Sequence, residues 1–292
     1  MSILINKSTG IMIQGMTGKQ GRIHGQLMIE YGANVQCGIS PGKGGMTVLD
    51  RPIYNSVAEA MQVHDISASL VLVPPLAVKS SVTEALQNGI KVISVIADGV
   101  PVKDTMYIRE MAHEYGAVIS GPNTTGIISP GKSKLGIMPG ALYSEGNIGI
   151  VSRSGSLTHE VASALSLHGI GQSTCFGIGG DPIPCTTYTE ILELFRNDPE
   201  TESVVLIGEI GGNNEDNAAE YLLRSNYPKQ VYSFIVGRSA PPGKNMGHAG
   251  AIISGGTGSA ESKREKLRKG GVTVVDTIEE LIEVIRKDAA NQ

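Results

Sequence analysis

The stretch IMIQGMTGKQG, at residues 11–21, combines a short apolar run with three glycines, and a helical pattern continues from it to about Tyr31. A strand followed by a glycine turn and a helix can hold a phosphate group at the amino end of the helix. The glycine spacing is GxxGxxG and not the dinucleotide GxGxxG, so the motif alone is a weak signal. It predicts an α/β unit that binds a phosphorylated ligand.

Further strand-like runs follow in the first half, and helical patterns separate most of them. They lie at residues 34–39, 69–73, 91–96 and 117–119. This alternation predicts a parallel sheet with crossover helices, that is, a Rossmann-like domain over residues 1–125. Glycine and proline interrupt the rhythm after residue 121, so residues 126–146 are expected to form a linker.

The same alternation restarts in residues 147–292. Expected strands lie at 148–151, 172–176, 204–207, 231–236 and 272–275, with helices at 156–167, 188–197, 214–225, 259–269 and 278–286. Five strands with intervening helices predict a flavodoxin-like doubly wound domain. In such a sheet, ligands bind beyond the carboxyl ends of the strands, and four glycine-containing loops of this half lie there.

Composition narrows the class of protein. A chain of 292 residues favours two domains, and its 38 glycines cluster after apolar runs, as in ligand-binding turns. A net charge of −4 argues against nucleic acid, and the basic run 263–269, interleaved with glutamates, is expected to be a solvated helix face. Three cysteines without CxxC spacing predict neither a disulfide framework nor a zinc site. Without a membrane span or a targeting segment, a cytoplasmic protein is expected.

The loop after the second strand bears on the ligand of the first domain. A nicotinamide dinucleotide site would want an acidic residue there for the ribose hydroxyls. The chain instead reads GISPGKGG over residues 38–45, which supplies Lys43 and no acid. A lysine on a glycine-rich loop beside a phosphate-binding helix suits coenzyme A with its several phosphates. The alternative is a solvated surface lysine in a turn.

Three segments of the second half together suggest phosphoryl chemistry. His248 lies between small residues in MGHAGA, where an imidazole can meet a ligand, although a histidine in a plain loop is the alternative. Glu209 ends an apolar strand, and its carboxylate could hold the imidazole NδH or be satisfied by loop NH groups. Residues 154–156, Ser-Gly-Ser, open a helix whose backbone NH groups can cap or bind an anion. We interpret the set as a phosphohistidine site.

At this point the chain resembles the alpha subunits of the succinyl-CoA synthetase family over essentially its whole length. Several of the matching stretches are long, and they occur in the family's order. They are MSILINK (1–7), GMTGKQG (15–21), SPGKGG (40–45), GPN (121–123), PGKSKLGIMPG (130–140), IGIVSRSGSLTHE (148–160), GQSTCFGIGGDPIP (171–184), LIGEIGG (206–212) and GHAGAII (247–253).

The resemblance implies a CoA-binding domain followed by a ligase domain, with His248 as the phosphorylated residue and Glu209 as its contact. It implies phosphate binding at Ser154, Gly155 and Ser156. The positions that match the family's CoA contacts are Thr17, Gly18, Lys19, Gln20, Lys43, Ile96, Ala97 and Asp98. It also implies a beta subunit with an ATP-grasp fold that supplies Mg²⁺ and the ATP or GTP site, in an αβ or α₂β₂ assembly.

The implied reaction passes a phosphoryl group from a nucleoside triphosphate to His248, then to a dicarboxylate, and CoA displaces it from the acyl phosphate. Four positions depart from the family pattern, and three of them are expected near the acyl or CoA thiol end. His159 replaces a usual Tyr near the acid substrate, Thr124-Thr125 replaces Cys-Pro, Cys185 replaces a small Gly, and Ala97-Asp98 replaces Thr-Glu. Succinate is the expected acid, and malate or another dicarboxylate is the alternative.

Two other classes of protein are open to the same residues. One is a non-catalytic CoA-binding paralogue, which the intact GHAGAII and GEIGG stretches argue against. The other is an NAD-dependent dehydrogenase, which the missing acid after the second strand argues against.

Overall fold

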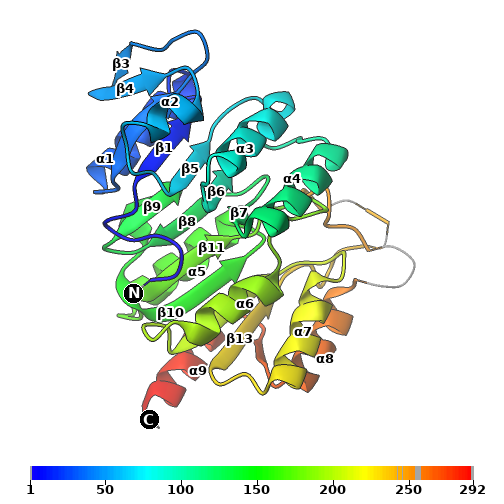
Figure 1. Ribbon diagram of the computed structural model, residues 1–292. Helices are drawn as coiled ribbons and strands as arrows, with labels where there is room; N and C mark the ends of the chain where they lie inside the picture. The colour runs from blue at the N-terminus through cyan, green and yellow to red at the C-terminus, as the bar shows by residue number, and fades with distance from the viewer. Residues whose placement is uncertain (1, 242, 245, 254–257, 291–292) are drawn as a thin grey trace.

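The apolar runs of the sequence form two mainly parallel sheets, one in each half of the chain. In this computed structural model the described residues are 2–241, 243–244, 246–253 and 258–290. Figure 1 shows the two sheets one below the other, each flanked by helices, as the chain passes from blue to red. The α/β architecture predicted from the sequence is confirmed.

The first sheet has the strand order of a dinucleotide-binding fold. Its strands, from edge to edge, are β3 (Thr47–Val48), β4 (Arg51–Tyr54), β2 (Val35–Ile39), β1 (Ile11–Gln14), β5 (Ala68–Val71), β6 (Val92–Val95) and β7 (Val118–Ser120). From β4 to β7 the pairing is parallel and reads 3-2-1-4-5-6, which is the Rossmann order. The short β3 pairs antiparallel with β4, and the sequence pattern did not predict either strand.

Helices connect these strands across both faces of the first sheet. They are α1 (Lys19–Glu30), α2 (Val57–Met61), η1 (Pro75–Ala77), α3 (Val78–Gln87) and α4 (Val102–Tyr115). The strands are buried on both faces, which explains why they read as continuous apolar runs without alternation.

The second sheet contains the predicted flavodoxin-like core. Its strands, from edge to edge, are β14 (Thr273–Val275), β13 (Gln230–Ile235), β12 (Ser203–Gly208), β10 (Glu145–Ser152), β11 (Gln172–Gly177), β8 (Gly126–Ser129) and β9 (Ser133–Gly136). The five strands from β14 to β11 are parallel, and their order is 5-4-3-1-2.

The helices of this half are α5 (Gly155–Leu167), α6 (Tyr188–Asn197), α7 (Asn214–Ser225), α8 (Ala260–Lys269) and α9 (Ile278–Ala290), and a short η2 (Gly140–Leu142) precedes β10. Two of them, α6 and α7, begin and end at the predicted residues. A capping box at Thr187 and Glu190 explains the sharp start of α6. Among the described residues, no helix is long and apolar enough to cross a lipid bilayer.

The segment expected to be a linker, residues 126–146, carries strands β8 and β9. They form an antiparallel hairpin that pairs with β11 and extends the second sheet. The glycines that suggested irregular chain have a different role. A Cβ at Gly126 would lie 2.2 Å from the Leu135 carbonyl oxygen, so the two backbones meet where only glycine fits. The domain limits 1–125 and 147–292 stay a prediction.

The chain between the domains lies along the carboxyl edge of the second sheet. The Gly121 amide donates to the Ile178 carbonyl (3.2 Å), and the Gly180 amide donates to the Asn123 carbonyl (3.0 Å). These bonds bring the exit from β7 beside the loop that follows β11. The carboxyl edges of the two sheets therefore meet at one region of the molecule.

Candidate functional site

The structure brings His248 and Glu209 into direct contact. Glu209 directly follows β12 and is 6% exposed, and His248 lies in the long segment that follows β13. His248 Nδ1 lies 2.7 Å from Glu209 Oε2, while 30% of the imidazole side chain is exposed. Because β12 and β13 are adjacent parallel strands, the loops beyond their carboxyl ends converge.

This contact affects the titration of the histidine. The hydrogen bond to Glu209 raises the pKa of His248 above its ordinary value of 6.5, and the carboxylate charge acts in the same direction. Burial and the nearby Arg153 guanidinium oppose the increase. In the neutral ring, we assign the proton to Nδ1, which then donates to the carboxylate, and Nε2 carries the lone pair.

Arg153 is a further member of the site, which the sequence alone does not single out. Its side chain is 2% exposed, and its Nε lies 3.3 Å from Glu209 Oε1. Its Nη2 also donates to the Asp181 carbonyl (3.1 Å), and a Cβ at Gly250 would lie 2.5 Å from Nη2. The guanidinium therefore lies against the backbone of the histidine segment and beside the carboxylate.

Gly180 packs against the imidazole. A Cβ at this position would lie 2.5 Å from His248 Cδ2 and 2.9 Å from Nε2, so only glycine allows the ring its present place. The next residue, Asp181, is buried, and burial raises the pKa of its carboxyl group. The glycines after β11 indicate a loop at the ligand edge, but the sequence alone does not reveal this contact with the imidazole.

Ser154, Gly155 and Ser156 begin α5, as predicted. Ser154 is the N-cap, and its hydroxyl accepts a hydrogen bond from the Leu157 amide (3.4 Å). Gly155 lies close to Thr125, whose Cγ2 would be 2.5 Å from a Cβ at that position. The helix start thus adjoins Arg153 in the chain, and the anion-binding role proposed for it stays a prediction.

Lys263 and Arg264 show that the predicted solvated face at residues 263–269 was wrong in part. Lys263 is fully buried and Arg264 is 2% exposed. Lys263 pairs with Glu215, which is also fully buried. The interleaved glutamates in the sequence predict an exposed helix face. The burial of these two cations instead depends on acceptors contributed by other segments of the chain.

The predicted CoA residues near the glycine loop lie together. Lys43 Nζ donates to Thr17 Oγ1 (3.1 Å), and Thr17 Oγ1 donates to Ser40 Oγ (3.1 Å). Gly18 is the N-cap of α1 and offers no side-chain cap, so exposed Lys19 and Gln20 open the helix. A cavity of about 190 Å³ lies here, lined by Gln14, Gly15, Thr17, Ile39, Ser40, Pro41, Lys43, Val73, Ser81 and Glu84.

The other predicted CoA segment, Ile96-Ala97-Asp98, follows β6 and lies beside the chain that leaves β7. The Asn123 amide donates to the Ala97 carbonyl (2.9 Å). Asp98 is exposed, and its charge adds to the effect of burial in raising the pKa of Asp181. The segment therefore lies between the first domain and the loop that holds Gly180.

The residues that depart from the family pattern have defined surroundings. His159 Nδ1 lies 2.6 Å from the Tyr143 hydroxyl, and burial lowers the pKa of His159. Thr124 is buried and its hydroxyl donates to the Gly177 carbonyl (2.9 Å). Burial raises the pKa of Cys185 to about 12, so it is a thiol at neutral pH. Thr124 and Cys185 thus pack the junction of the domains.

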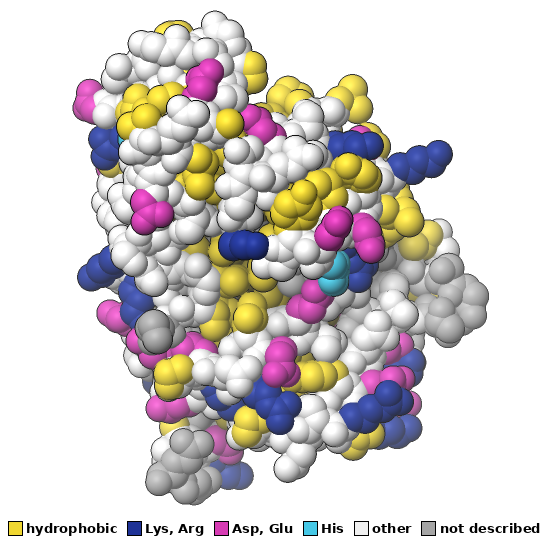
Figure 2. Space-filling view, viewed as in Figure 1, with side chains coloured by type: hydrophobic (Ala, Val, Ile, Leu, Met, Phe, Trp, Pro, Cys, Tyr) yellow, Lys and Arg dark blue, Asp and Glu magenta, His cyan; other side chains and the backbone are white. Residues whose placement is uncertain are grey.

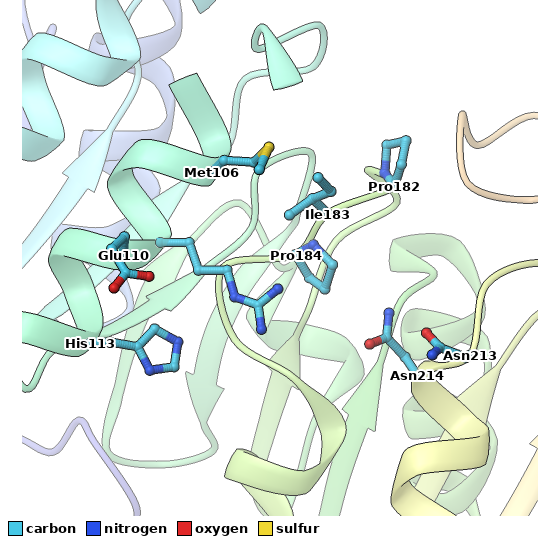
Figure 3. A pocket seen from close by; sticks show the side chains of 9 residues that line it. Met106, Glu110, His113, Pro182, Ile183, Pro184, Asn213 and Asn214 are labelled. Atoms are coloured by element: carbon cyan, nitrogen blue, oxygen red, sulfur yellow. The ribbon is translucent and has the colours of Figure 1, made fainter. Parts of the chain in front are cut away.

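A cavity of about 550 Å³ opens between α4 and the second domain. Figure 3 shows Met106, Glu110 and His113 on one side and the loop Pro182-Ile183-Pro184 opposite, with Asn213 and Asn214 beyond it. Arg109 also lines it. Since Pro182 lies two residues after Gly180, this cavity lies beside the imidazole region.

Exposed apolar side chains lie on the same helix, α4, and on the short η1. Leu76, Val102, Met106 and Tyr107 are between 46% and 81% exposed. Figure 2 shows hydrophobic side chains gathered over α4 on the face that carries the cavity. Such gathering is typical of a surface that contacts another molecule.

Comparisons with known proteins agree on the family. The CoA binding domain family matches residues 6–99, and the CoA-ligase family matches residues 151–273. A succinate–CoA ligase [ADP-forming] subunit alpha of Methanothermobacter thermautotrophicus is 49% identical over 97% of this chain and 96% of its own. A malate–CoA ligase subunit alpha of Methylorubrum extorquens is 46% identical over 94% of each.

The fold is also shared with a larger enzyme of known structure. A mutant ATP citrate lyase of Methanosaeta concilii in complex with (3S)-citryl-CoA superposes with a TM-score of 0.90 at 22% identity. The match covers 98% of this chain and 50% of that one. At this level of identity, the similarity establishes the two-domain fold and nothing finer.

Proposed function

Because the chain belongs to the family of ADP-forming acid–CoA ligase alpha subunits, represented by the succinate–CoA ligases, we propose that it carries a phosphoryl group on His248 between a nucleoside triphosphate and a dicarboxylate. CoA then converts the acyl phosphate into a thioester. The contact between His248 and Glu209 is the observation that supports this proposal most strongly.

The chemistry of phosphoryl acceptance follows from the hydrogen bond at Nδ1. Glu209 accepts the hydrogen bond from Nδ1–H and so keeps the proton on Nδ1. We therefore assign phosphorylation to Nε2. The Nε2 lone pair forms a bond to the γ-phosphorus of the nucleoside triphosphate. The bond from this phosphorus to the bridging oxygen breaks, and the nucleoside diphosphate leaves. The phosphorylated ring then bears positive charge, which the Glu209 carboxylate stabilises.

The next two steps release the histidine and consume CoA. A carboxylate oxygen of the acid attacks the phosphorus, the bond from phosphorus to Nε2 breaks, and an acyl phosphate results. The CoA sulfur, having lost its proton, attacks the acyl carbon, and inorganic phosphate leaves. In these steps we propose that the helix start at Ser154, Gly155 and Ser156 binds the phosphoryl oxygens, because backbone NH groups at the amino end of a helix favour negative charge.

The test of the phosphoryl carrier uses the chain together with its beta subunit and γ-labelled nucleotide. We expect a label on the alpha chain that is labile to acid and stable to base, and that is absent in His248→Asn. A wild-type complex that forms thioester without such a label would rule out the phosphohistidine. A chain that binds CoA but forms neither label nor thioester would instead be the non-catalytic paralogue.

We assign CoA to the glycine-loop side of the first domain. The cluster of Thr17, Lys43 and the α1 start offers a cation and free NH groups for its phosphates. The segment Ile96-Ala97-Asp98 would then guide the pantetheine arm toward Asn123 and the second domain. Differential scanning with CoA and with NAD tests this assignment, since a dehydrogenase would be stabilised by NAD.

Succinate is our proposed acid, and malate is the second candidate. The relative with 49% identity bears the name of a succinate enzyme, and a relative with 46% identity bears that of a malate enzyme. His159, with its Tyr143 partner, is the departure that we assign to the choice between them.

The partner is proposed from the subunit names of the relatives. We infer a beta subunit with an ATP-grasp fold, which would hold Mg²⁺ and the ATP or GTP, in an αβ or α₂β₂ assembly. Among the described residues of this chain, no group of three or more His, Cys, Asp or Glu side chains could hold a metal ion. Cys37, Cys175 and Cys185 are free and buried, in keeping with a cytoplasmic location, which we also propose.

A further inference from the structure

We propose that the buried pair of Lys263 and Glu215 is a positioning device that fixes Glu209, and through it the imidazole of His248. The inference rests on the proposed role of His248 as phosphoryl carrier. Neither Lys263 nor Glu215 touches the imidazole in the described contacts, so they are positioning residues and not catalytic ones.

The Lys263 ammonium holds the carbonyl side of the Glu209 loop. Lys263 Nζ donates to the Glu209 carbonyl (2.8 Å), to the Gly211 carbonyl (2.5 Å) and to Glu215 Oε2. An ammonium has three hydrogens, so these acceptors use its full donor capacity. Two of the three are backbone atoms of the loop that carries the glutamate.

The Glu215 carboxylate holds the amide side of the same residue. Its Oε1 accepts from the Glu209 amide (3.1 Å), while Oε2 pairs with Lys263. A Cβ at Gly208 would lie 2.9 Å from Oε1, so the glycine before Glu209 makes room for this carboxylate. Both backbone polar groups of Glu209 are therefore satisfied by one buried ion pair.

The held loop also touches the histidine segment. A Cβ at Gly211 would lie 2.1 Å from the Gly250 carbonyl oxygen and 2.8 Å from the Ile252 amide nitrogen. The Gly211 amide donates to the Gly258 carbonyl (2.8 Å), just before α8, the helix that carries Lys263. A shift of this loop would move Glu209 away from His248 and disturb the backbone on which His248 lies.

A fully buried ion pair is a poor means of adding stability, because desolvation offsets the attraction between the charges. Its benefit here is geometric. Lys263 lies on α8 and Glu215 lies on α7, so both side chains are fixed by helices and not by the loops of the site. Their hydrogen bonds fix the backbone of Glu209 relative to these two helices. A hydrophobic pair of the same size would leave the Glu209 backbone unbonded.

The experiment compares Glu215→Gln/Lys263→Met with the wild type, each assembled with the beta subunit. The double change removes both charges, keeps the approximate volume, and removes the donors to Glu209 and Gly211. Lys266→Met is the matched control, because Lys266 joins the same two helices through Asp216 at the surface. Glu215→Asp is the second variant, which keeps the charge and withdraws the carboxylate from the Glu209 amide.

For the double variant we expect the rate of His248 phosphorylation to fall by about tenfold or more, with the CoA Kd changed by less than about twofold, since positioning alone is worth such factors. The acid limb of the phosphorylation rate should move to lower pH, because the imidazole loses the hydrogen bond that raises its pKa. Glu215→Asp should show a smaller loss in the same direction, and Lys266→Met should match the wild type.

A folded double variant with the phosphorylation rate and acid limb of the wild type would overturn the inference. If the double variant fails to bind CoA, the test depends on Glu215→Asp. A phosphorylation rate and acid limb equal to those of the wild type in Glu215→Asp would also overturn the inference. Absence of label in the wild type is a separate result, since it removes the phosphohistidine itself.

Discussion

Arg153 Nε and Glu209 Oε1 lie 3.3 Å apart in the interior, so the carboxylate that holds the imidazole is shared with a guanidinium. Neither of these two atoms has a hydrogen-bond partner among the described residues, which makes the pair an electrostatic contact. The two neighbours of the carboxylate act on His248 in opposite directions, since Glu209 raises its pKa and Arg153 lowers it. This opposition gives two predictions with opposite signs.

Glu209→Gln should move the acid limb of His248 phosphorylation to lower pH. Only the neutral imidazole is nucleophilic, so the rate falls as the pH drops through the pKa of His248. Glu209 raises that pKa, and its removal lowers it. At the optimum, the rate should still fall by about 10- to 10²-fold, because the amide oxygen of glutamine is a weaker acceptor than a carboxylate and does not neutralise the positive charge of the phosphorylated ring. Rapid-quench labelling from pH 5 to 9 measures both effects, and an unmoved limb would contradict the electrostatic role of Glu209.

Arg153→Gln should move the same limb to higher pH, because the positive charge that disfavours the imidazolium is removed. The free energy of unfolding should decrease by about 3 kcal/mol, since the variant leaves a buried carboxylate without its guanidinium. Denaturant titration measures the second effect. A limb that moves in the direction seen for Glu209→Gln would show that Arg153 acts by holding the glutamate and not through its charge.

Gly180→Ala should impair phosphorylation while the protein stays folded. The added methyl group would lie within 2.9 Å of three atoms of the His248 ring, and the ring can move more readily than the backbone. We expect the phosphorylation rate to fall by about tenfold to 10²-fold, as a displacement near 1 Å can cause. The CoA Kd and Tm serve as controls. A variant of normal rate would place the ring elsewhere in the active assembly.

Lys43→Met should weaken CoA binding without slowing the transfer of phosphate to His248. Lys43 contacts Thr17 beside the α1 start, far along the chain from the imidazole. Because the lysine is exposed, we expect a loss of affinity of about tenfold at low salt and less at high salt. Calorimetry with CoA measures it, with Lys7→Met as the surface control. Equal losses in both variants would indicate a general charge effect.

His159→Tyr should change the preference among acids. The substitution replaces a neutral imidazole bonded to Tyr143 with a phenol. We expect the ratio of kcat/KM for succinate and malate to change by about tenfold, a typical effect of one polar contact. The panel should include itaconate and citrate, and Tyr143→Phe removes the hydrogen bond alone. A ratio unchanged in both variants would assign His159 to packing.

The contact between His248 and Glu209 could be predicted because it follows from sheet order. Each residue lies beyond the carboxyl end of a parallel strand, and adjacent strands bring such loops together. The same reasoning placed the glycine loop of α1 near Lys43. The apolar runs indicate where the strands lie, and their alternation with helices indicates the doubly wound order.

The buried partners of the site could not be predicted in this way. Lys263 lies 48 residues from Glu215, and its helix reads as a surface of mixed charge. Arg153 directly precedes the N-cap Ser154, and this sequence indicates a helix start and not a buried guanidinium beside Glu209. The β8–β9 hairpin was missed because its glycines mark close backbone contact, whereas glycine in sequence ordinarily signals a turn.

The β8–β9 hairpin also protects the second domain from unwanted self-association. Its pairing with β11 covers a row of NH and carbonyl groups that would otherwise be open to another chain, and α1 of the first domain packs against β9. A protein cut at residue 147 would expose that row. The ligase half should therefore aggregate when it is produced without the CoA-binding half, even though its own parallel strands are complete.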